Sequence, residues 1–236
     1  ILKKNKNKYK IYLNIIKILK LIQKINSKSI TTFKKKNYVI PQYSKNKLLN
    51  ESKLFLYWYL PKVLKKTKKR KAKKEIEKIF NNLYAKLKFK KRVFVHRDFH
   101  VSNMMFYKKK IYLIDNQDAV YGHMAYDLAS LIDDVRLKTS RNLKDKIFKI
   151  YIKLNSSIDQ KKFKNDFEIL SVLRNLKIIG IFTRLAIRDG KIKYMRLIPY
   201  AWKMIEQRTS NNLVFEELEK TLNKYFSKRV RLKKWK

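Results

Sequence analysis

The sequence predicts an α+β fold that is mainly α, formed by one domain over residues 1–236. Most of the chain carries apolar residues at helical spacing, whereas residues 92–115 change to short runs typical of β-strands. Hydrophobic residues make up 45% of the chain and aromatic residues 13%, which is enough for a packed core. The three Gly and three Pro exclude a low-complexity chain, and the absence of Cys excludes disulfides and Cys-ligated metal sites.

Three helical regions are predicted before the β-type stretch. Residues 9–25 form an amphipathic helix that is expected to pack on the domain and not to lie on an anionic membrane. Lysines interrupt this segment, so no membrane span is predicted. Residues 48–59 form a second helix that ends at Pro61, and residues 76–87 carry a third apolar stripe. The basic run over residues 65–74 is expected to be a solvated connector.

The β-type stretch contains three expected strands. Residues 93–95 form a strand, and residues 104–107 and 111–114 form a hairpin with its turn at residues 108–110. After this stretch the spacing of apolar residues becomes helical again. Helices are predicted over residues 125–135, 143–154, 163–179, 194–205 and 213–226.

The charge of the chain is strongly positive, with 61 Lys and Arg against 18 Asp and Glu, a formal net charge of +43. Such an excess suggests binding to phosphate backbones. However, the 49 lysines occur with 18 Asn and many Ile, residue types whose codons are rich in A and T. The lysines are also scattered and do not alternate with aromatic residues in a base-stacking pattern. Codon usage therefore accounts for most of the charge, and a nucleic-acid partner is not expected.

The residues that suit chemistry lie in and after the first predicted strand. Asp98 and Asn103 are five positions apart in His-Arg-Asp-Phe-His-Val-Ser-Asn, and Asp115 ends the hairpin twelve positions later. A carboxylate that is not engaged by metal can accept the proton of an acceptor hydroxyl. Asp and Asn side-chain oxygens are ligands that Mg²⁺ prefers. The pattern predicts phosphoryl transfer, with Asp98 as base and Asn103 and Asp115 as metal ligands.

The residues around this pattern narrow the prediction. His96 is expected to be a packed, hydrogen-bonded residue, and Arg97 is expected to pair with a carboxylate such as that of Asp127. The three His are too few and too separated to predict a zinc site. The first 121 residues contain no Gly, so they cannot supply a Gly-rich loop around phosphates.

Residues 96–105 together with residues 113–115 resemble the catalytic region of the aminoglycoside phosphotransferase family, the small-molecule relatives of protein kinases. Residues 51–60, 116–134 and 180–191 resemble one branch in particular, the anomeric kinases of N-acetylmuramate and N-acetylglucosamine that serve cell-wall recycling. The resemblance covers roughly residues 40–210.

The resemblance implies an ATP- and Mg²⁺-dependent kinase that phosphorylates the C1 hydroxyl of an amino sugar. Because no secretion or membrane signal is found, the cytoplasm is the expected compartment. Asp98 would activate that hydroxyl, and Asn103 and Asp115 would hold Mg²⁺ against ATP. Asp127 would be structural and would tie the catalytic loop to the following helix. Four further residues lie in segments that could reach the sugar: Glu51, Gln117, Asp118 and His123.

Two departures from the family pattern are present. The metal-binding Asp of the family is usually followed by Phe or Trp, whereas Asp115 is followed by Asn116. Related kinases also carry a β-rich N-terminal lobe over ATP, whereas the residues before Asp98 are predicted to be helical. The chain is therefore expected to be the C-terminal lobe of a protein-kinase-like phosphotransferase, with its catalytic loop and metal hairpin over residues 92–118 and a helical remainder over residues 125–227. An isolated lobe of this kind is expected to turn over poorly.

Three alternatives remain at this point. An aminoglycoside-modifying enzyme would share the catalytic residues but not the segments after Asp115. A protein kinase is disfavoured because Asp115 lacks the following Phe-Gly and no Ala-Pro-Glu segment follows. A degenerate lobe that binds nucleic acid or an anionic surface is the alternative from a different functional class.

Overall fold

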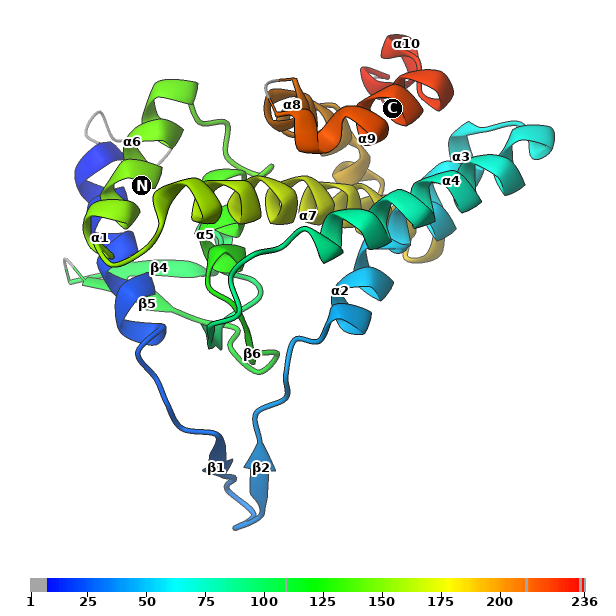
Figure 1. The fold of residues 1–236 in the computed structure, drawn as a ribbon. Helices are drawn as coiled ribbons and strands as arrows, with labels where there is room; N and C mark the ends of the chain where they lie inside the picture. The colour runs from blue at the N-terminus through cyan, green and yellow to red at the C-terminus, as the bar shows by residue number, and fades with distance from the viewer. Residues whose placement is uncertain (1–7, 109, 211, 234, 236) are drawn as a thin grey trace. The chain divides into compact units, whose positions relative to one another are not determined.

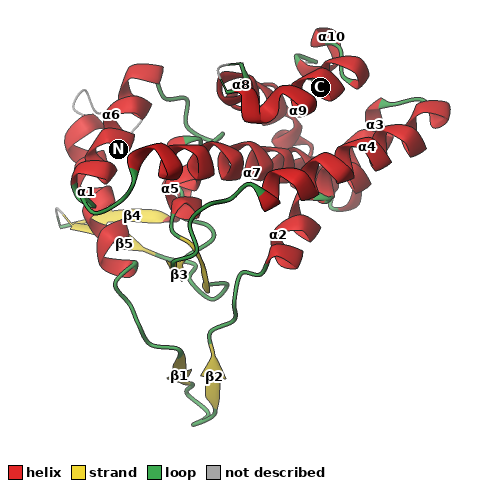
Figure 2. Cartoon of the chain, viewed as in Figure 1, coloured by secondary structure: helices red, strands yellow, loops and turns green. Residues whose placement is uncertain are grey.

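The fold is known from a computed structural model that describes residues 8–108, 110–210, 212–233 and 235. The architecture is α+β and mainly helical, as predicted, with short strands that pair two by two in the described residues (Figures 1 and 2). The chain forms two compact units. The first unit combines Ile1–Ser44 with Lys88–Phe167, and the second combines Lys45–Leu87 with Glu168–Lys236. No helix in the described ranges is both long enough and apolar enough to cross a membrane.

Helices of the first unit enclose a core of aromatic and aliphatic side chains. Helix α1 (Lys8–Ile22) packs on α6 (Arg141–Lys153), and its apolar face is buried, as the amphipathic pattern predicted. Tyr151 of α6 stacks on Phe163, with ring centroids 5.3 Å apart. Every residue of the intervening helix α5 (Ala125–Ile132) is buried. This core supports the strands that carry the predicted catalytic residues.

Three antiparallel strand pairs complete the first unit. Strand β3 (Arg92–Val95) pairs with β6 (Val120–His123), and β4 (Met104–Tyr107) pairs with β5 (Lys110–Leu113). The predictions of β3, β4 and β5 are confirmed, but β6 was missed. The pair formed by β1 (Ser29–Thr31) and β2 (Asn37–Val39) was also missed, because three-residue strands carry too little alternation to be detected.

The second unit is helical in its described residues. Trp202 is fully buried and its indole N–H donates to Tyr59 Oη at 3.1 Å. Phe55 and Phe226 contact the same two rings. Burial raises the pKa of the Tyr59 hydroxyl to about 12, so this side chain is a neutral hydrogen-bonding member of the core. The remaining elements of the unit are α2 (Lys45–Ser52), α3 (Leu60–Val63), α4 (Lys66–Ala85), α8 (Ile198–Thr209), α9 (Glu216–Tyr225), α10 (Lys228–Arg231) and the 3₁₀ helices Ile192–Leu197 and Leu213–Phe215.

The predicted end of a helix at Pro61 is wrong. The chain passes from α2 through a π-helix, Phe55–Tyr59, into α3, which continues to Val63. Pro61 lies in the first turn of α3, where its missing N–H is tolerated. The preceding N–H of Leu60 donates to the carbonyl of Phe55, five residues back, in the wide spacing of the π-helix.

The prediction of a connector over residues 65–74 is also wrong. These residues form the first half of α4, apart from Lys65 at its N-cap. Lys and Arg are good helix formers, and Ala72 is fully buried on the same helix as Ile76 and Phe80. The lysine side chains are mostly exposed, so the run is solvated but not a linker.

Gly180 allows a close approach of two backbones in the second unit. It lies within α7 (Gln160–Arg188), and a Cβ atom there would be 2.3 Å from the backbone carbonyl carbon of Leu54. Real Cβ atoms essentially never come so close to backbone, so only Gly fits here. The position explains why an otherwise unfavourable helix-interior Gly is tolerated.

Gly180→Ala is expected to lower the free energy of unfolding. Ala stabilises an ordinary helix position by about 0.5–1 kcal/mol relative to Gly, whereas overpacking costs about 1–3 kcal/mol or more. We expect the clash to exceed the helix propensity gain, so the urea midpoint should fall. Gly190→Ala is the comparison. A Cβ there meets no atom within 4 Å, so this variant has the strain of its left-handed φ of +65° but no steric clash. A midpoint that rises in Gly180→Ala would contradict the backbone contact.

Candidate active site

Asp127 fixes the start of the loop that follows β3. Its two carboxylate oxygens accept from the backbone N–H groups of His96, at 2.7 Å, and Arg97, at 3.1 Å. Asp127 is fully buried near the N-terminus of α5. Arg97 has a left-handed φ of 71°, an unfavourable conformation for a residue with a side chain. The paired hydrogen bonds hold this strained turn in place.

Asn103 joins the two parts of the predicted catalytic group. Its side-chain amide lies 3.1 Å from the carbonyl oxygen of Asp98 and 3.4 Å from Oδ2 of Asp115, and it donates to both. The backbone carbonyl of Asn103 accepts from the backbone N–H of Ile114 at 3.0 Å. The structure thus brings together Asp98, Asn103 and Asp115, which are up to seventeen positions apart in the sequence.

Asp115 is exposed at the end of the β4–β5 hairpin and has a left-handed φ of 70°. Oδ1 of its carboxylate accepts from the side-chain amide of Gln117 at 2.8 Å, while Oδ2 faces Asn103. Amide donors on both oxygens fix the orientation of the carboxylate. The Asn103 amide nitrogen contacts both Asp98 and Asp115, so the side-chain oxygen of Asn103 and the Asp115 carboxylate are the oxygen groups of the kind that Mg²⁺ prefers.

Asp98 differs from Asp115 in its surroundings. Its side chain is partly buried, and within the described residues it takes part in no hydrogen bond or ion pair. Its backbone carbonyl is used instead, since it accepts from the N–H of His100 at 2.9 Å as well as from Asn103. The loop therefore holds the backbone of Asp98 and leaves its carboxylate available to a substrate.

His96 links the catalytic loop to the hairpin. Its Nε2 lies 3.1 Å from the carbonyl oxygen of Ile114, the residue before Asp115. Burial lowers the pKa of the His96 ring, so the neutral form is favoured. Because a carbonyl only accepts, the hydrogen-bond network assigns the ring proton to Nε2. A neutral, buried and hydrogen-bonded ring fits the packed, structural role that the sequence predicts for His96.

Arg97 and Asp118 are connected at the edge of this group. The Arg97 guanidinium donates to the Asp118 carbonyl at 3.2 Å and lies 3.8 Å from its carboxylate. The same guanidinium lies over the ring of Tyr43, 5.3 Å from its centroid. These contacts restrain the segment after Asp115, in which Gln117 and Asp118 are exposed.

His123 and Glu51, two residues predicted to reach the sugar, have partners within the protein. His123 is 2% exposed, and its Nε2 lies 2.9 Å from Oδ2 of Asp166. Its Nδ1 accepts from the N–H of Ala125, which places the proton on Nε2. Glu51 belongs to the second unit, where its carboxylate lies 2.6 Å from Nζ of Lys177.

Asp166 was missed by the sequence analysis. It is fully buried in α7, and it accepts from His123 and from the backbone N–H groups of Lys88 and Phe89. Burial raises the pKa of this carboxyl, but the hydrogen bonds from His123, Phe89 and Lys88 together outweigh burial, so the pKa lies below its usual value. Its place between Phe163 and Phe167 on a buried helix face was the available signal for a structural Asp.

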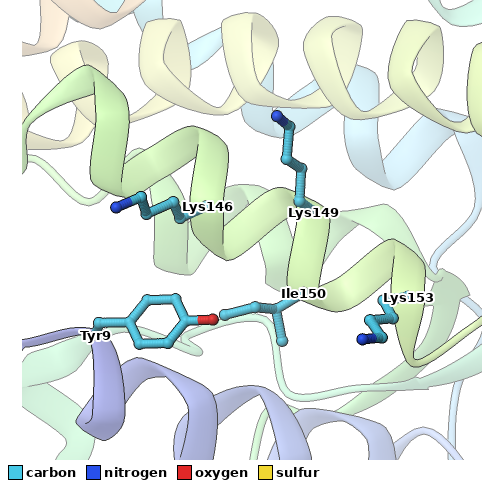
Figure 3. A pocket seen from close by; sticks show the side chains of 5 residues that line it. All are labelled: Tyr9, Lys146, Lys149, Ile150 and Lys153. Atoms are coloured by element: carbon cyan, nitrogen blue, oxygen red, sulfur yellow. The ribbon is translucent and has the colours of Figure 1, made fainter.

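A pocket of about 360 Å³ lies elsewhere in the first unit, between α1 and α6 (Figure 3). In Figure 3 the ring of Tyr9 points toward Ile150, while the ammonium groups of Lys146, Lys149 and Lys153 point in different directions. These lysines do not converge on one point, so the pocket offers no built anion site.

Comparison with known proteins assigns the family. The family model described as "Phosphotransferase enzyme family" matches residues 7–157. This match includes the catalytic loop, the hairpin and Asp127. The chain belongs to the phosphotransferase enzyme family.

Curated members of this family give a more specific likeness. N-acetylmuramate/N-acetylglucosamine kinase of Neisseria meningitidis serogroup B is 34% identical over 169 residues, which are 68% of this chain and 50% of that protein. The kinases of the same name from Caulobacter vibrioides and Pseudomonas aeruginosa are 32% and 29% identical, over 56% and 78% of this chain and 38% and 56% of those proteins. The chain spans about half the length of the curated relatives it matches.

Solved structures show the fold that the family shares. Plasmodium vivax ethanolamine kinase matches with a TM-score of 0.55 at 14% identity, covering 85% of this chain and 60% of that one. A choline/ethanolamine kinase family protein from Mesorhizobium loti matches with a TM-score of 0.57 at 10% identity, covering 92% and 68%. The predicted kinase-like fold is therefore confirmed.

Asp127→Ala is expected to loosen the catalytic loop. It leaves two buried backbone N–H groups without their acceptor, which we expect to cost about 3 kcal/mol of unfolding free energy. Hydrogen exchange at the amides of His96 and Arg97 should accelerate. Asp127→Asn keeps one acceptor oxygen, so its unfolding free energy should fall less than that of Asp127→Ala. Unchanged exchange in Asp127→Ala would show that these N–H groups do not depend on the carboxylate.

Asp166→Asn is expected to destabilise the protein in a pH-dependent way. The pKa of Asp166 is lower in the folded state than its ordinary value of 3.8. The ionised carboxylate therefore stabilises the folded protein at pH values above 3.8, and this stabilisation is lost as the pH falls through the pKa of the folded state. We expect a loss of about 2 kcal/mol at neutral pH that shrinks on acidification. Unfolding midpoints between neutral and acid pH test this, with Asp145→Asn at an exposed position of α6 as control. An equal loss at every pH would refute it.

Proposed function

We propose that the chain carries the catalytic loop of an ATP- and Mg²⁺-dependent kinase that phosphorylates the C1 hydroxyl of N-acetylmuramate or N-acetylglucosamine. The observation that carries the proposal is the Asn103 amide, which joins the backbone of Asp98 to the carboxylate of Asp115. The likeness to kinases named for these two sugars supports the choice of substrate.

Asp98 is the proposed general base. Its carboxylate is free of hydrogen bonds among the described residues, while its backbone carbonyl is held by two donors. As the C1 oxygen forms its bond to the γ-phosphorus, the bond from that phosphorus to the β-phosphate oxygen breaks and ADP leaves. Asp98 accepts the hydroxyl proton in this step. A base held through its backbone keeps its position while its side chain meets the sugar.

Asn103 and Asp115 are the residues that would hold Mg²⁺. Their side chains adjoin through the Asn103 amide nitrogen, and each side chain also has an oxygen atom, the ligand type that Mg²⁺ prefers. When bound, Mg²⁺ neutralises negative charge on the phosphates of ATP. Gln117 keeps the Asp115 carboxylate oriented from its other side, at 2.8 Å. Asn116 lies between these two residues and is exposed, so it does not prevent this arrangement.

The β4–β5 hairpin supplies an apolar surface next to the proposed metal ligands. Met105 and Tyr112 are opposite each other on β4 and β5, and they are 56% and 47% exposed. Ile114, immediately before Asp115, is 43% exposed. Exposed apolar side chains beside a phosphate-binding cation suit the flat face of a nucleotide base. This surface supports ATP as the phosphoryl donor.

The segment after Asp115 is the proposed sugar-contact region. Gln117 and Asp118 are exposed and are restrained by Asp115 and Arg97. Their amide and carboxylate groups can bond sugar hydroxyls. The contacts of His123 with Asp166 and of Glu51 with Lys177 favour structural roles for these two residues.

Asp98→Asn tests the proposed base. Removing a general base costs about 100-fold or more in turnover, and the amide has nearly the same size, so sugar binding should persist. Transfer of phosphate from Mg-ATP to each sugar is followed by ³¹P NMR in the longest form of the protein that the gene encodes. Asp145→Asn, exposed on α6, is the matched control and should keep its turnover. Retained turnover in Asp98→Asn would remove Asp98 from this role.

A second measurement separates the kinase from a basic binding module. Sugar-induced thermal stabilisation should persist at high salt if the sugar is bound by neutral hydrogen bonds. Binding to a nucleic-acid duplex releases counterions and weakens steeply with salt. No stabilisation by either sugar, together with salt-sensitive duplex binding, would favour the binding module.

A further inference from the structure

The β1–β2 hairpin is anchored at its base by Tyr121 of β6. The Tyr121 hydroxyl lies 3.0 Å from the carbonyl oxygen of Ile25 and 2.9 Å from that of Ser27, on the chain entering β1. The backbone of Tyr121 bonds to Pro41 and Tyr43, on the chain leaving β2, at 2.9 and 2.7 Å. Both ends of the hairpin are therefore held by one residue, and in Figure 1 the hairpin projects beyond this attachment.

The tip of the hairpin has a defined backbone. Thr32 and Lys36 exchange backbone and hydroxyl hydrogen bonds of 2.8–3.2 Å, and the N–H of Lys35 donates to the Thr32 carbonyl. Lys35 takes a left-handed φ of 55° to close the turn. These bonds define the backbone of the turn, which carries residues 33–35 at the tip of the hairpin.

Apolar side chains of the hairpin face solvent. Phe33 at the tip is fully exposed, at 103% of its reference area, and Val39 and Ile30 are 65% and 51% exposed. A projecting tip offers no concave surface, so these side chains do not form a ligand pocket. They are placed to enter an apolar phase or a cavity of another molecule.

The charges of the hairpin sequence are all positive. Phe33 is followed directly by three exposed lysines, residues 34–36, and Lys28 precedes β1. The first acidic residue of the whole sequence is Glu51. An apolar tip followed by lysines in a segment without acidic residues complements a surface that is negative outside and apolar beneath.

We propose that the β1–β2 hairpin docks the protein on an anionic lipid surface, with Phe33 entering the interface and residues 34–36 contacting the headgroups. Each lysine near such a surface strengthens binding about 5-fold, and an inserted aromatic ring adds salt-insensitive binding. The proposal is independent of the proposed kinase activity. It also differs from binding through α1, because Tyr12, Ile15, Ile16 and Leu19, the apolar face of that helix, are buried in the core.

Cosedimentation of residues 1–236 with vesicles tests the proposal. The probes are pure phosphatidylcholine vesicles and mixed phosphatidylcholine–phosphatidylglycerol vesicles at physiological ionic strength. We expect binding to the mixed vesicles only. Replacing residues 34–36 by Gln should weaken it about 100-fold, and Phe33→Ser about 10-fold.

Matched variants separate docking from general attraction by the high net charge. Lys66, Lys68 and Lys74 are exposed on α4, and replacing all three by Gln removes the same charge elsewhere. Leu213→Ser removes an apolar side chain that is 88% exposed. Both controls should change binding by less than about 3-fold, because the proposal assigns lipid contact to the hairpin and not to the net charge or to exposed apolar residues in general.

Insertion is measured directly with brominated lipid. Trp fluorescence of Phe33→Trp should be quenched more strongly than that of Leu213→Trp, because both variants retain the same native Trp residues. Equal quenching, equal losses in the two triple-Gln variants, no effect of Phe33→Ser, or no vesicle binding at all would each overturn the proposal. Capture by an acidic protein in place of vesicles would identify a different partner and overturn it as well.

Discussion

The Asp127 carboxylate accepts two hydrogen bonds, from the backbone N–H groups of His96 and Arg97, and the proposed catalytic residues depend on this interaction. These hydrogen bonds stabilise a left-handed residue immediately before Asp98. Because Asp127 is buried in a helix whose residues are all buried, the core fixes the loop. A charged acceptor for two N–H groups is also costly to lose, which makes this contact a strict constraint.

A second set of hydrogen bonds joins this loop to the β4–β5 hairpin. His96 reaches the carbonyl of Ile114, and Asn103 bonds to both Asp98 and Asp115. Asp98, the proposed base, and Asn103 and Asp115, the proposed metal ligands, therefore share one hydrogen-bonded frame, although they come from a loop and from a separate strand end. Such sharing keeps the reacting groups at fixed separations, which phosphoryl transfer requires.

The lysines that give the chain its positive charge have different surroundings in different parts of the structure. On α4 the lysines are the solvent-facing side of a helix whose other side is buried. At the tip of the β1–β2 hairpin the lysines flank an exposed Phe and have no acidic neighbours in sequence. The net charge alone does not distinguish these cases. The distinction depends on whether apolar side chains beside the lysines are buried or exposed.

The sequence by itself determined the class of fold, the position of most helices, and the loop and hairpin that carry Asp98, Asn103 and Asp115. These features depend on local spacing, since helical periodicity and a loop motif are written in neighbouring residues. Predictions from local spacing were wrong at Pro61 and at residues 65–74. Both segments are helical, because side chains on the same helices, Phe55, Tyr59 and Ala72, are buried in the core.

Only the tertiary structure decided the partners of residues far apart in the chain. His123 has Asp166 as its partner, 43 positions away, and Tyr121 holds a hairpin whose strands are too short to be predicted. Gly180 is required by a backbone that lies more than a hundred residues earlier. Burial and long-range contact arise from packing, and no local pattern of residues encodes which distant group will lie alongside.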